Sequence, residues 1–581
     1  MSLASIPMKD PASDENRSFT TAQMITKKSK KFKNSRRKSI LTTDEYDNSS
    51  YEGNLQSSTS NTASSTEVED SDLESTTPKA KVDTSSFSSS ESSETESTTP
   101  TQLKQRLFSE KRRKELSKAY RQRRKLRYKQ DGSIRSKFAD IKSQPRATIF
   151  DAEIHFGSKF YGFAVAFWFA VAAFGAKVLL DYETTQGSIL RSLIVKIMLK
   201  DLWKVAATDL AMYLSTYFSV LVQLLVKKGF IDWSTIGCKL IGVFEVGFVG
   251  FYIWFARYME FPWIAKIFLM LHSIVLLMKL HSYSFYNGYL WNITKELKFS
   301  EGYLKKHAED DALSEEVMNA LTSSVEFCKF ELSSQSKDYP FPRNITFKNF
   351  FMYSMFPTVV YEIDYPRNER IRKHYLFGKI AGIFGVIFLM MAIAQQHLYP
   401  IVMKCLEMRE TLSLWVRIQR YPLIILETIP PFLSIYILTF YLIWELILNA
   451  IAELTCFADR EFYRYWWNSV NWNDYARDWN VPIHQFLLRH VYHSSISAFN
   501  VSKGSATLLT FFLSSIVHEL AMWVIFDKLR GYLLLLQMAQ LPLIQLSKTP
   551  LLKERQTVGN CIFWFGILFG PSLMCTMYLV F

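Results

Sequence analysis

The chain has 581 residues and a formal net charge of +14, and 49% of its residues are apolar. The charge is concentrated at one end, because residues 1–150 carry 29 Lys and Arg against 20 Asp and Glu. A segment this charged and this poor in apolar groups cannot form a packed core, which excludes a single soluble globular domain. The six cysteines show neither close pairs nor metal-ligand spacing, so no disulfide framework and no metal site is expected.

Residues 1–150 are expected to form a disordered, basic and Ser/Thr-rich cytosolic tail. Residues 48–101 are dominated by Ser, Thr and Glu, and basic clusters lie at 27–38 and 104–129. Such clusters either stay solvated or are attracted to anionic lipid head groups. Nucleic-acid binding is not indicated, because no nucleic-acid-binding fold accompanies the charge. Nothing in the tail resembles a chemical site, so we expect removal of residues 1–140 to leave the chemistry largely intact.

From Phe160 onward the sequence contains apolar runs long enough to cross a hydrocarbon layer of roughly 30 Å. Residues 151–581 therefore predict an all-α polytopic membrane domain. Pro430 and Pro431 are expected to break or kink the sixth run. The eighth run is a span, a re-entrant segment or a segment buried within the bundle. Nine spans are expected, at 160–180, 204–226, 236–257, 263–281, 378–398, 423–450, 505–526, 530–547 and 559–581.

The sequence also predicts an orientation in the membrane. No secretory signal precedes the tail, because the first apolar run lies far inside the chain. With a cytosolic N-terminus, nine spans place the C-terminus in the lumen and the two longest loops, 282–377 and 451–504, in the cytosol. The 12 Lys and Arg of the first loop agree with this orientation.

Ionisable side chains at membrane depth are costly and therefore mark candidate functional sites. Most of them are expected to pair within the bundle or to lie near a membrane interface. His518 differs, because it lies near the middle of the run 505–526 with Ser514 one turn earlier on the same helical face. It is either a structural hydrogen-bonding group or a catalytic one. The six candidates singled out within the expected spans are Asp209, Glu245, Lys279, Glu445, His518 and Glu519.

An imidazole at this depth suits acyl transfer. An alcohol attacks a thioester slowly unless its proton is removed as the bond forms, and imidazole can accept that proton near neutral pH. Burial in a low-dielectric tunnel is expected to keep His518 neutral. The developing oxyanion then needs a donor such as an amide side chain or a backbone N–H. No protein nucleophile is required if the alcohol attacks acyl-CoA directly.

An aromatic segment before this helix supplies further candidates. It reads FYRYWWN at 462–468 and WNVPIH at 479–484, a composition that is also typical of a membrane-interface belt. Asn480 and His484 are four residues apart, so on a helix they would share a face, with Pro482 in the first turn. Four basic residues of the same stretch are either solvated or able to meet coenzyme A phosphates: Arg464, Arg477, Arg489 and Lys503.

At these residues the chain resembles the membrane-bound O-acyltransferase family, in its sterol and diacylglycerol O-acyltransferase branch, and most closely the fungal sterol enzymes. One departure stands out, because Tyr465 occupies the position of an Asp in the branch's signature. The matching segments are FYRYWWN (462–468), DWNVPIH (478–484), LLRHVYHSS (487–495) and FFLSSIVHELAM (511–522), supported by HSYSFYNGYL (281–290) and PTVVYEIDYPRNERIR (357–372).

The resemblance implies a curved bundle with a tunnel for acyl-CoA from the cytosol and a lateral opening for a lipid alcohol. It implies that His518 is the general base and that Asn480 positions or polarises the reacting groups. Arg477 and Lys503 are expected at the coenzyme A phosphates because of their charge. The residues implied to line the acyl-CoA channel are Phe462, Tyr463, Trp466, Trp467, Asn468, His484, Tyr492 and Ser514.

The sequence therefore predicts a sterol O-acyltransferase of the endoplasmic reticulum membrane, which uses long-chain acyl-CoA as co-substrate and needs no cofactor or metal. The resemblance also implies a homodimer or homotetramer. Diacylglycerol is the alternative acceptor, and sterol is favoured because LLRHVYHSS and the long basic tail are more like the fungal sterol enzymes. A transporter is an alternative from another class, although the sequence lacks the paired, similar halves of many transporters. A structural scaffold would leave the matches at Asn480, His484 and His518 unexplained.

Overall fold

The computed structural model describes residues 127–128, 134–138, 141–153, 161–188, 191–306, 315–336, 338–499, 501–553 and 555–581. The chain divides into two units, Met1–Glu94 with Ile496–Thr507 and Thr95–Ser495 with Leu508–Phe581. Most described residues belong to the second unit. The predicted disorder of the N-terminal tail falls largely outside the described residues and stays a prediction there.

The described residues fold into helices, without a named strand. The α-helices are α3 (Ile149–Glu153), α4 (Tyr161–Gln186), α5 (Leu193–Leu199), α6 (Leu202–Ser215), α7 (Phe218–Lys227), α8 (Cys238–Tyr258), α9 (Trp263–Lys306), α10 (Glu315–Ser334), α11 (Phe347–Met355), α12 (Lys373–Ile393), α13 (Tyr399–Thr411), α14 (Leu414–Phe440), α15 (Leu448–Leu454), α16 (Trp472–Asp478), α17 (Val481–Phe486), α18 (His493–Phe499), α19 (Lys503–Phe526), α20 (Tyr532–Met538), α21 (Gln540–Ser547), α22 (Pro550–Lys553) and α23 (Gln556–Val580). Short π-helical segments are η2 (Trp233–Gly237), η3 (Ala394–Leu398), η4 (Tyr441–Ile447) and η6 (Leu487–Tyr492), and η5 (Trp466–Asn468) is a 3₁₀ turn.

Seven helices among the described residues are long and apolar enough to cross a membrane, so the chain is a multi-pass membrane protein. The predicted count of nine is not confirmed. The first expected span coincides with α4, and the eighth is the shorter pair α20–α21, which a turn at Ala539 interrupts. The seven are Leu202–Lys227, Trp233–Tyr258, Trp263–Lys306, Lys373–Thr411, Leu414–Leu454, Lys503–Phe526 and Gln556–Val580.

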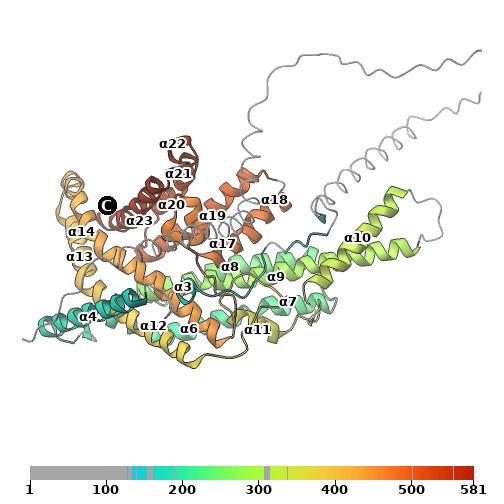
Figure 1. The fold of residues 1–581 in the computed structure, drawn as a ribbon, viewed down its shortest axis with the longest axis horizontal. Coiled ribbons are helices and arrows are strands. Elements are labelled where there is room, and N and C mark those ends of the chain that lie inside the picture. The colour runs from blue at the N-terminus through green and yellow to red at the C-terminus, as the bar shows by residue number, and fades with distance from the viewer. Residues whose placement is uncertain are drawn as a thin grey trace, which may run out of the picture. The chain divides into compact units, whose positions relative to one another are not determined.

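Helix α9 is the longest element and the scaffold for the site described below. The sequence predicted only its first part, 263–281, as a span, but the helix continues to Lys306 because no Pro interrupts the polar residues that follow. It packs against α8 on one side and against α10 on another (Figure 1). Part of the expected cytosolic loop 282–377 is therefore a rigid continuation of a spanning helix.

A buried glycine lets η2 pack closely against α9. A Cβ built at Gly288 would overlap the indole ring of Trp233, which is itself buried. We expect Gly288→Ala to destabilise the protein by about 1–3 kcal/mol, because a well-packed site cannot absorb the added methyl without moving the indole. A lowered midpoint in a detergent thermal-stability assay, read by fluorescence-detected size exclusion, tests this.

Gly302 on the same helix is the matched control. No atom of the described chain lies within 4 Å of a Cβ built there. Gly302→Ala should be neutral or stabilising by up to about 1 kcal/mol, because alanine favours the helix more than glycine. Equal effects of the two substitutions would contradict the packing argument.

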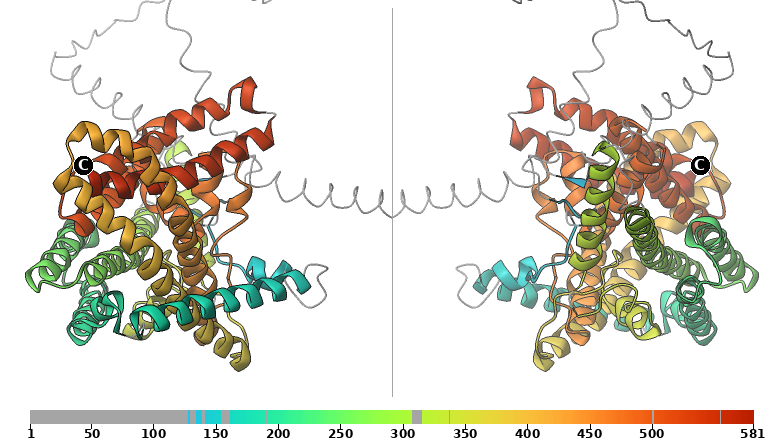
Figure 2. Two further views of the ribbon diagram at one scale, coloured as in Figure 1. Left: turned by 90° about the vertical axis from the view of Figure 1, so that its left-hand side faces the viewer. Right: turned by 90° about the vertical axis from the view of Figure 1, so that its right-hand side faces the viewer.

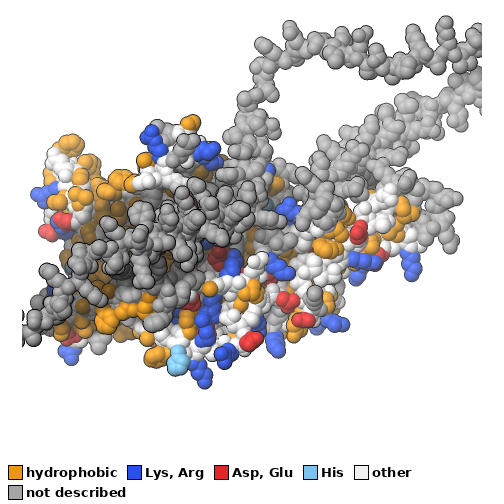
Figure 3. Space-filling view, in the orientation of Figure 1, with side chains coloured by type: hydrophobic (Ala, Val, Ile, Leu, Met, Phe, Trp, Pro, Cys, Tyr) orange, Lys and Arg blue, Asp and Glu red, His pale blue; other side chains and the backbone are white. Residues whose placement is uncertain are grey.

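The C-terminal helix α23 packs against α13 and α14, beside which the C-terminus lies in Figure 2. Arg417 and Tyr421 of α14 donate to the carbonyl oxygens of Val580 and Leu573, both at 2.8 Å. Helix α14 continues through Pro430 and Pro431, so this span is not broken there, and the kink expected as the other possibility stays a prediction. Apolar side chains gather over α13 and α14 on the face shown in Figure 3, as expected of helices that face lipid.

Candidate functional site

The ionisable groups within the spans are mostly paired with other elements, as the sequence predicted. Asp209 lies 2.6 Å from Nδ1 of His272, and Glu245 lies 3.0 Å from Nδ1 of His281. Lys279 donates to backbone carbonyls, including that of Phe356 at 2.6 Å. A charged group at this depth needs such partners to offset its lost hydration.

Two acids of the same set join several elements. Glu445 accepts from Lys379 at 2.5 Å, from Tyr463 at 2.8 Å and from Thr148 at 2.7 Å. Glu519 accepts four backbone N–H groups at the start of α20, including that of Gly531 at 2.7 Å, and the hydroxyl of Tyr578 in α23 at 2.7 Å. Both carboxylates are therefore committed to holding helices together.

Among the six ionisable residues, and within the described part of the chain, His518 alone bonds only its own helix. Its Nδ1 lies 2.7 Å from the carbonyl oxygen of Ser514. Because a carbonyl can only accept, Nδ1 carries the proton in this hydrogen bond, and in the neutral ring Nε2 then keeps its lone pair. The backbone thus holds the ring in the tautomer that a general base needs.

The position of His518 follows from the packing of α19. The buried face of α19 carries Ser515, Glu519 and Met522, which recur at helical spacing and contact other elements or their own backbone. His518 precedes Glu519 by one residue, about 100° around the helix, and its side chain is exposed. The exposed ring is open to a substrate at the side of α19, and its expected place in a tunnel stays a prediction.

Asn480 starts the second element of the candidate site. Its side-chain oxygen accepts the N–H of Ile483 at 3.2 Å, which makes it the N-cap of α17. Pro482 lies in the first turn, as predicted. The expected shared helical face of Asn480 and His484 is wrong, because a cap residue has non-helical dihedral angles, here φ −146° and ψ 85°. With its oxygen used by the cap, the amide N–H₂ of Asn480 is the part that can donate to a substrate.

The hydrophobic face of α9 brings these two elements to one region. Ile274 packs in one apolar cluster with Leu520 and Ala521 of α19, and in another with Ile483 and Phe486 of α17. Residues 518 and 480 are 38 positions apart, yet both belong to elements whose apolar side chains share a cluster with Ile274. The half-buried residues His484 and Tyr492 follow on α17 and η6, and Ser514 supplies the carbonyl that binds His518.

The aromatic signature is mainly a structural core. Phe462, Tyr463 and Trp466 are 2%, 1% and 3% exposed and pack with Phe440 and Phe563. Such buried rings offer little surface to an acyl chain in this structure. The predicted contact with acyl-CoA stays a prediction, for which the two less buried members of the signature, Trp467 and Asn468, are better placed.

The basic residues of this region differ in their surroundings. Arg464 pairs with Glu461 at 3.1 Å, and Arg477 pairs with Asp478 at 3.0 Å. Arg489 is only 7% exposed and donates to backbone carbonyls, so it does not face solvent where a phosphate could meet it. Lys503 is the first residue of α19.

A buried polar pair, Ser282 and His490, was not predicted from the sequence. The hydroxyl of Ser282 in α9 lies 2.8 Å from Nε2 of His490 in η6 and accepts the N–H of Tyr361 at 2.7 Å. Burial, with the nearby charges of His281 and Arg489, holds the pKa of His490 well below its usual range. A neutral His490 therefore accepts a hydrogen bond from the Ser282 hydroxyl at Nε2. The matching segment HSYSFYNGYL contained Ser282, but nothing local indicated its partner.

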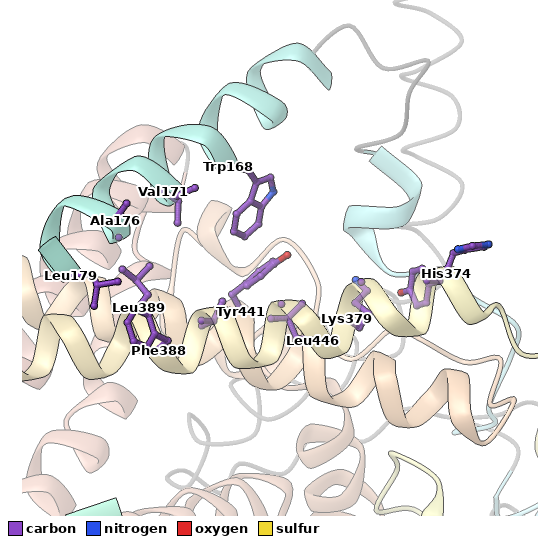
Figure 4. Close-up of a pocket in the computed structure, with 17 residues that line it drawn as sticks. Trp168, Val171, Ala176, Leu179, His374, Lys379, Phe388, Leu389, Tyr441 and Leu446 are labelled. Atoms are coloured by element: carbon purple, nitrogen blue, oxygen red, sulfur yellow. The ribbon is translucent and has the colours of Figure 1, made fainter. Parts of the chain in front are cut away.

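A pocket of about 710 Å³ lies between α4, α12 and η4 (Figure 4). Its lining is mostly apolar, with Trp168 of α4 next to Tyr441 of η4 at a ring-centroid distance of 5.2 Å. The lining includes none of the predicted site residues. No cluster of His, Cys, Asp or Glu that could hold a metal ion occurs among the residues that the structure describes.

Comparison with known proteins assigns the family. A model of the membrane-bound O-acyltransferase family matches residues 176–580. The chain belongs to this family. It is 51% identical to sterol O-acyltransferase 2 of Saccharomyces uvarum over 431 residues, covering 73% of the chain and 66% of the relative. It is 46% identical to sterol O-acyltransferase 2 of Candida albicans over 484 residues, covering 77% of the chain and 79% of the relative.

A relative with another acceptor is more distant. Diacylglycerol O-acyltransferase 1 of Dictyostelium discoideum is 33% identical over 238 residues, which cover 41% of the chain and 37% of the relative. The predicted resemblance to the fungal sterol enzymes is confirmed by these comparisons. Tyr465, which stands where the branch's signature has Asp, is 47% exposed, whereas its neighbour Trp466 is buried.

Proposed function

We propose that this membrane-bound O-acyltransferase transfers a long-chain acyl group from acyl-CoA to the 3-hydroxyl of a sterol. The observation that carries the proposal is the imidazole of His518 in the middle of a spanning helix. Its Nδ1 bonds the Ser514 carbonyl of the same helix, so that Nε2 can accept a proton. The sterol O-acyltransferases of two yeasts, at 46–51% identity, support the acceptor.

The mechanism needs only the groups already described. Nε2 of His518 takes the hydroxyl proton as the sterol oxygen attacks the thioester carbon. The carbonyl oxygen becomes an oxyanion, which the amide N–H₂ of Asn480 stabilises. The intermediate collapses with loss of the coenzyme A thiolate, which takes the proton from His518. One ester bond forms as one thioester bond breaks, and no covalent acyl-enzyme is required.

The acyl-CoA would contact the residues around this pair. His484, Tyr492 and Ser514 follow Asn480 or precede His518 and would line the acyl chain, together with Trp467 and Asn468. Arg477 and Lys503 would meet the phosphates, for which Arg477 exchanges its carboxylate partner for a phosphate of equal or greater charge. We further propose an endoplasmic reticulum location, a cytosolic N-terminus and a homo-oligomer.

Diacylglycerol is the second candidate acceptor. The two acceptors are distinguished by an assay of microsomes from cells that lack their own acyltransferases and express this chain, with labelled oleoyl-CoA and either sterol or diacylglycerol. We expect steryl ester as the dominant labelled product, because the matches to sterol enzymes cover about three quarters of the chain. Triacylglycerol as the dominant product would overturn the choice of acceptor, and the absence of any labelled ester would favour the transporter alternative.

A further inference from the structure

The segment that precedes the membrane domain is bound along its length to the body. This strap, residues 134–138 and 141–148, was expected to belong to the disordered tail, and is part of the blue segment that leads to α3 in Figure 1. At its start Phe138 stacks on Tyr286 of α9 at a centroid distance of 4.4 Å. At its end Thr148 donates to Glu445 at 2.7 Å.

The middle of the strap is fixed by carboxylates. The backbone N–H and the hydroxyl of Ser143 both donate to one oxygen of Glu362, at 2.9 and 2.8 Å. Gln144 donates its backbone N–H to Asp459 at 3.1 Å, and the guanidinium of Arg146 binds the same carboxylate at 2.8 Å. These partners lie more than 200 residues from the strap in the sequence.

One residue joins the strap to the element that starts at Asn480. Arg489 of η6 donates to the carbonyl of Ile141 in the strap and to that of Tyr361 at 3.1 Å. Its guanidinium carbon also lies 5.1 Å from the centre of the Phe138 ring. A buried guanidinium that bonds two carbonyls from separate segments fixes their relative position.

Apolar packing reinforces this connection. Ile141 of the strap packs in the same cluster as Ile483 and Phe486 of α17 and Ile274 of α9. Removing the strap would therefore expose one side of α17 and leave Arg489 without one of its carbonyl partners. The N-cap Asn480 is the first residue of the element that would move.

We propose that the strap is a positioning element for acyl transfer: docked on Glu362 and Arg489, it holds α17 so that Asn480 meets the reacting thioester, and its release lowers turnover. This inference rests on the proposed function. The strap residues act through α17 and do not touch substrate, so they are positioning and not catalytic residues.

The test places a negative charge against Glu362. In the full-length chain, Ser143→Glu should lower kcat for sterol esterification about tenfold with an unchanged KM for oleoyl-CoA, because small displacements of a catalytic group cost rate more than binding. The double variant Ser143→Glu with Glu362→Gln should recover the turnover of Glu362→Gln alone, because the repulsion is then absent. Ser333→Glu, at an exposed serine of α10 that bonds only its own helix, is the matched control.

Three outcomes decide the inference. Turnover of Ser143→Glu equal to that of the wild type, or a loss that Glu362→Gln does not recover, would overturn it, as would a fall in protein abundance with kcat per molecule unchanged. If Ser143→Glu does not accumulate, two truncations replace it: removal of residues 1–126 should keep kcat, and removal of residues 1–148 should lower it. A wild-type protein that forms no steryl ester would instead reject the proposed function.

Discussion

His518→Ala should abolish steryl ester formation while the protein still inserts into the membrane. The expected loss is about 10²–10⁴-fold in kcat, the usual contribution of a general base. The fold should survive, because His518 bonds only the Ser514 carbonyl of its own helix, whereas its neighbour Glu519 carries the contacts to α20 and α23. Labelled-ester formation per molecule of protein, with abundance and thermal stability measured in detergent, tests both parts.

The matched control is an exposed histidine in another spanning segment. His397 lies in the span Lys373–Thr411, and its side chain is also exposed. His397→Ala should keep wild-type turnover, because His397 is not one of the candidate site residues. A similar loss in both variants would mean that removing any exposed imidazole from a span lowers turnover. A His518→Ala protein that is folded and fully active would reject the mechanism proposed above.

Asn480 permits a test that separates its two roles. Asn480→Asp keeps the oxygen that caps α17 but removes the amide donor, and Asp is as good an N-cap as Asn. Asn480→Ala removes both. If Asn480 stabilises the oxyanion, both variants should lose about 10²–10³-fold in kcat, while only the alanine variant loses about 1 kcal/mol of stability.

The opposite pattern would identify a structural residue. Recovery of turnover in Asn480→Asp would mean that Asn480 acts only as a helix cap, and the oxyanion donor would then have to be another group. Asn473 in the preceding helix α16 is a suitable control for amide loss, because its side chain is not the cap of either helix. Asn473→Ala is expected to keep turnover.

The two candidate residues lie on helices that belong to apolar clusters with α9. Ile274 belongs to one apolar cluster with residues of the helix of His518 and to another with residues of the helix that Asn480 caps, so both helices are placed by packing in the same part of the core. The Ser282–His490 hydrogen bond and the Arg489 contacts hold the next turn, η6, from two further sides.

The sequence by itself determined the features that are local. Apolar runs of spanning length predicted an all-α membrane protein, because backbone groups in hydrocarbon must bond within their own segment. Asn480 followed by Pro482 predicted the start of α17, since a cap and a first-turn proline are signals carried by a few consecutive residues. His518 stood out for the same reason: an ionisable group in the middle of an apolar run needs an explanation wherever it packs.

Only the tertiary structure decided which side chains meet. The strap was predicted to be disordered from its composition, but Glu362 and Asp459, more than 200 positions away, bind it and offset the entropy of ordering it. The aromatic signature was expected along a channel, yet Phe462, Tyr463 and Trp466 are buried in a core. Aromatic rings suit both a channel lining and a packed core, so the sequence alone does not distinguish the two locations. Hydrogen bonds between distant residues, such as Ser282 with His490, have no local pattern, so the surroundings of the candidate residues are a property of the fold.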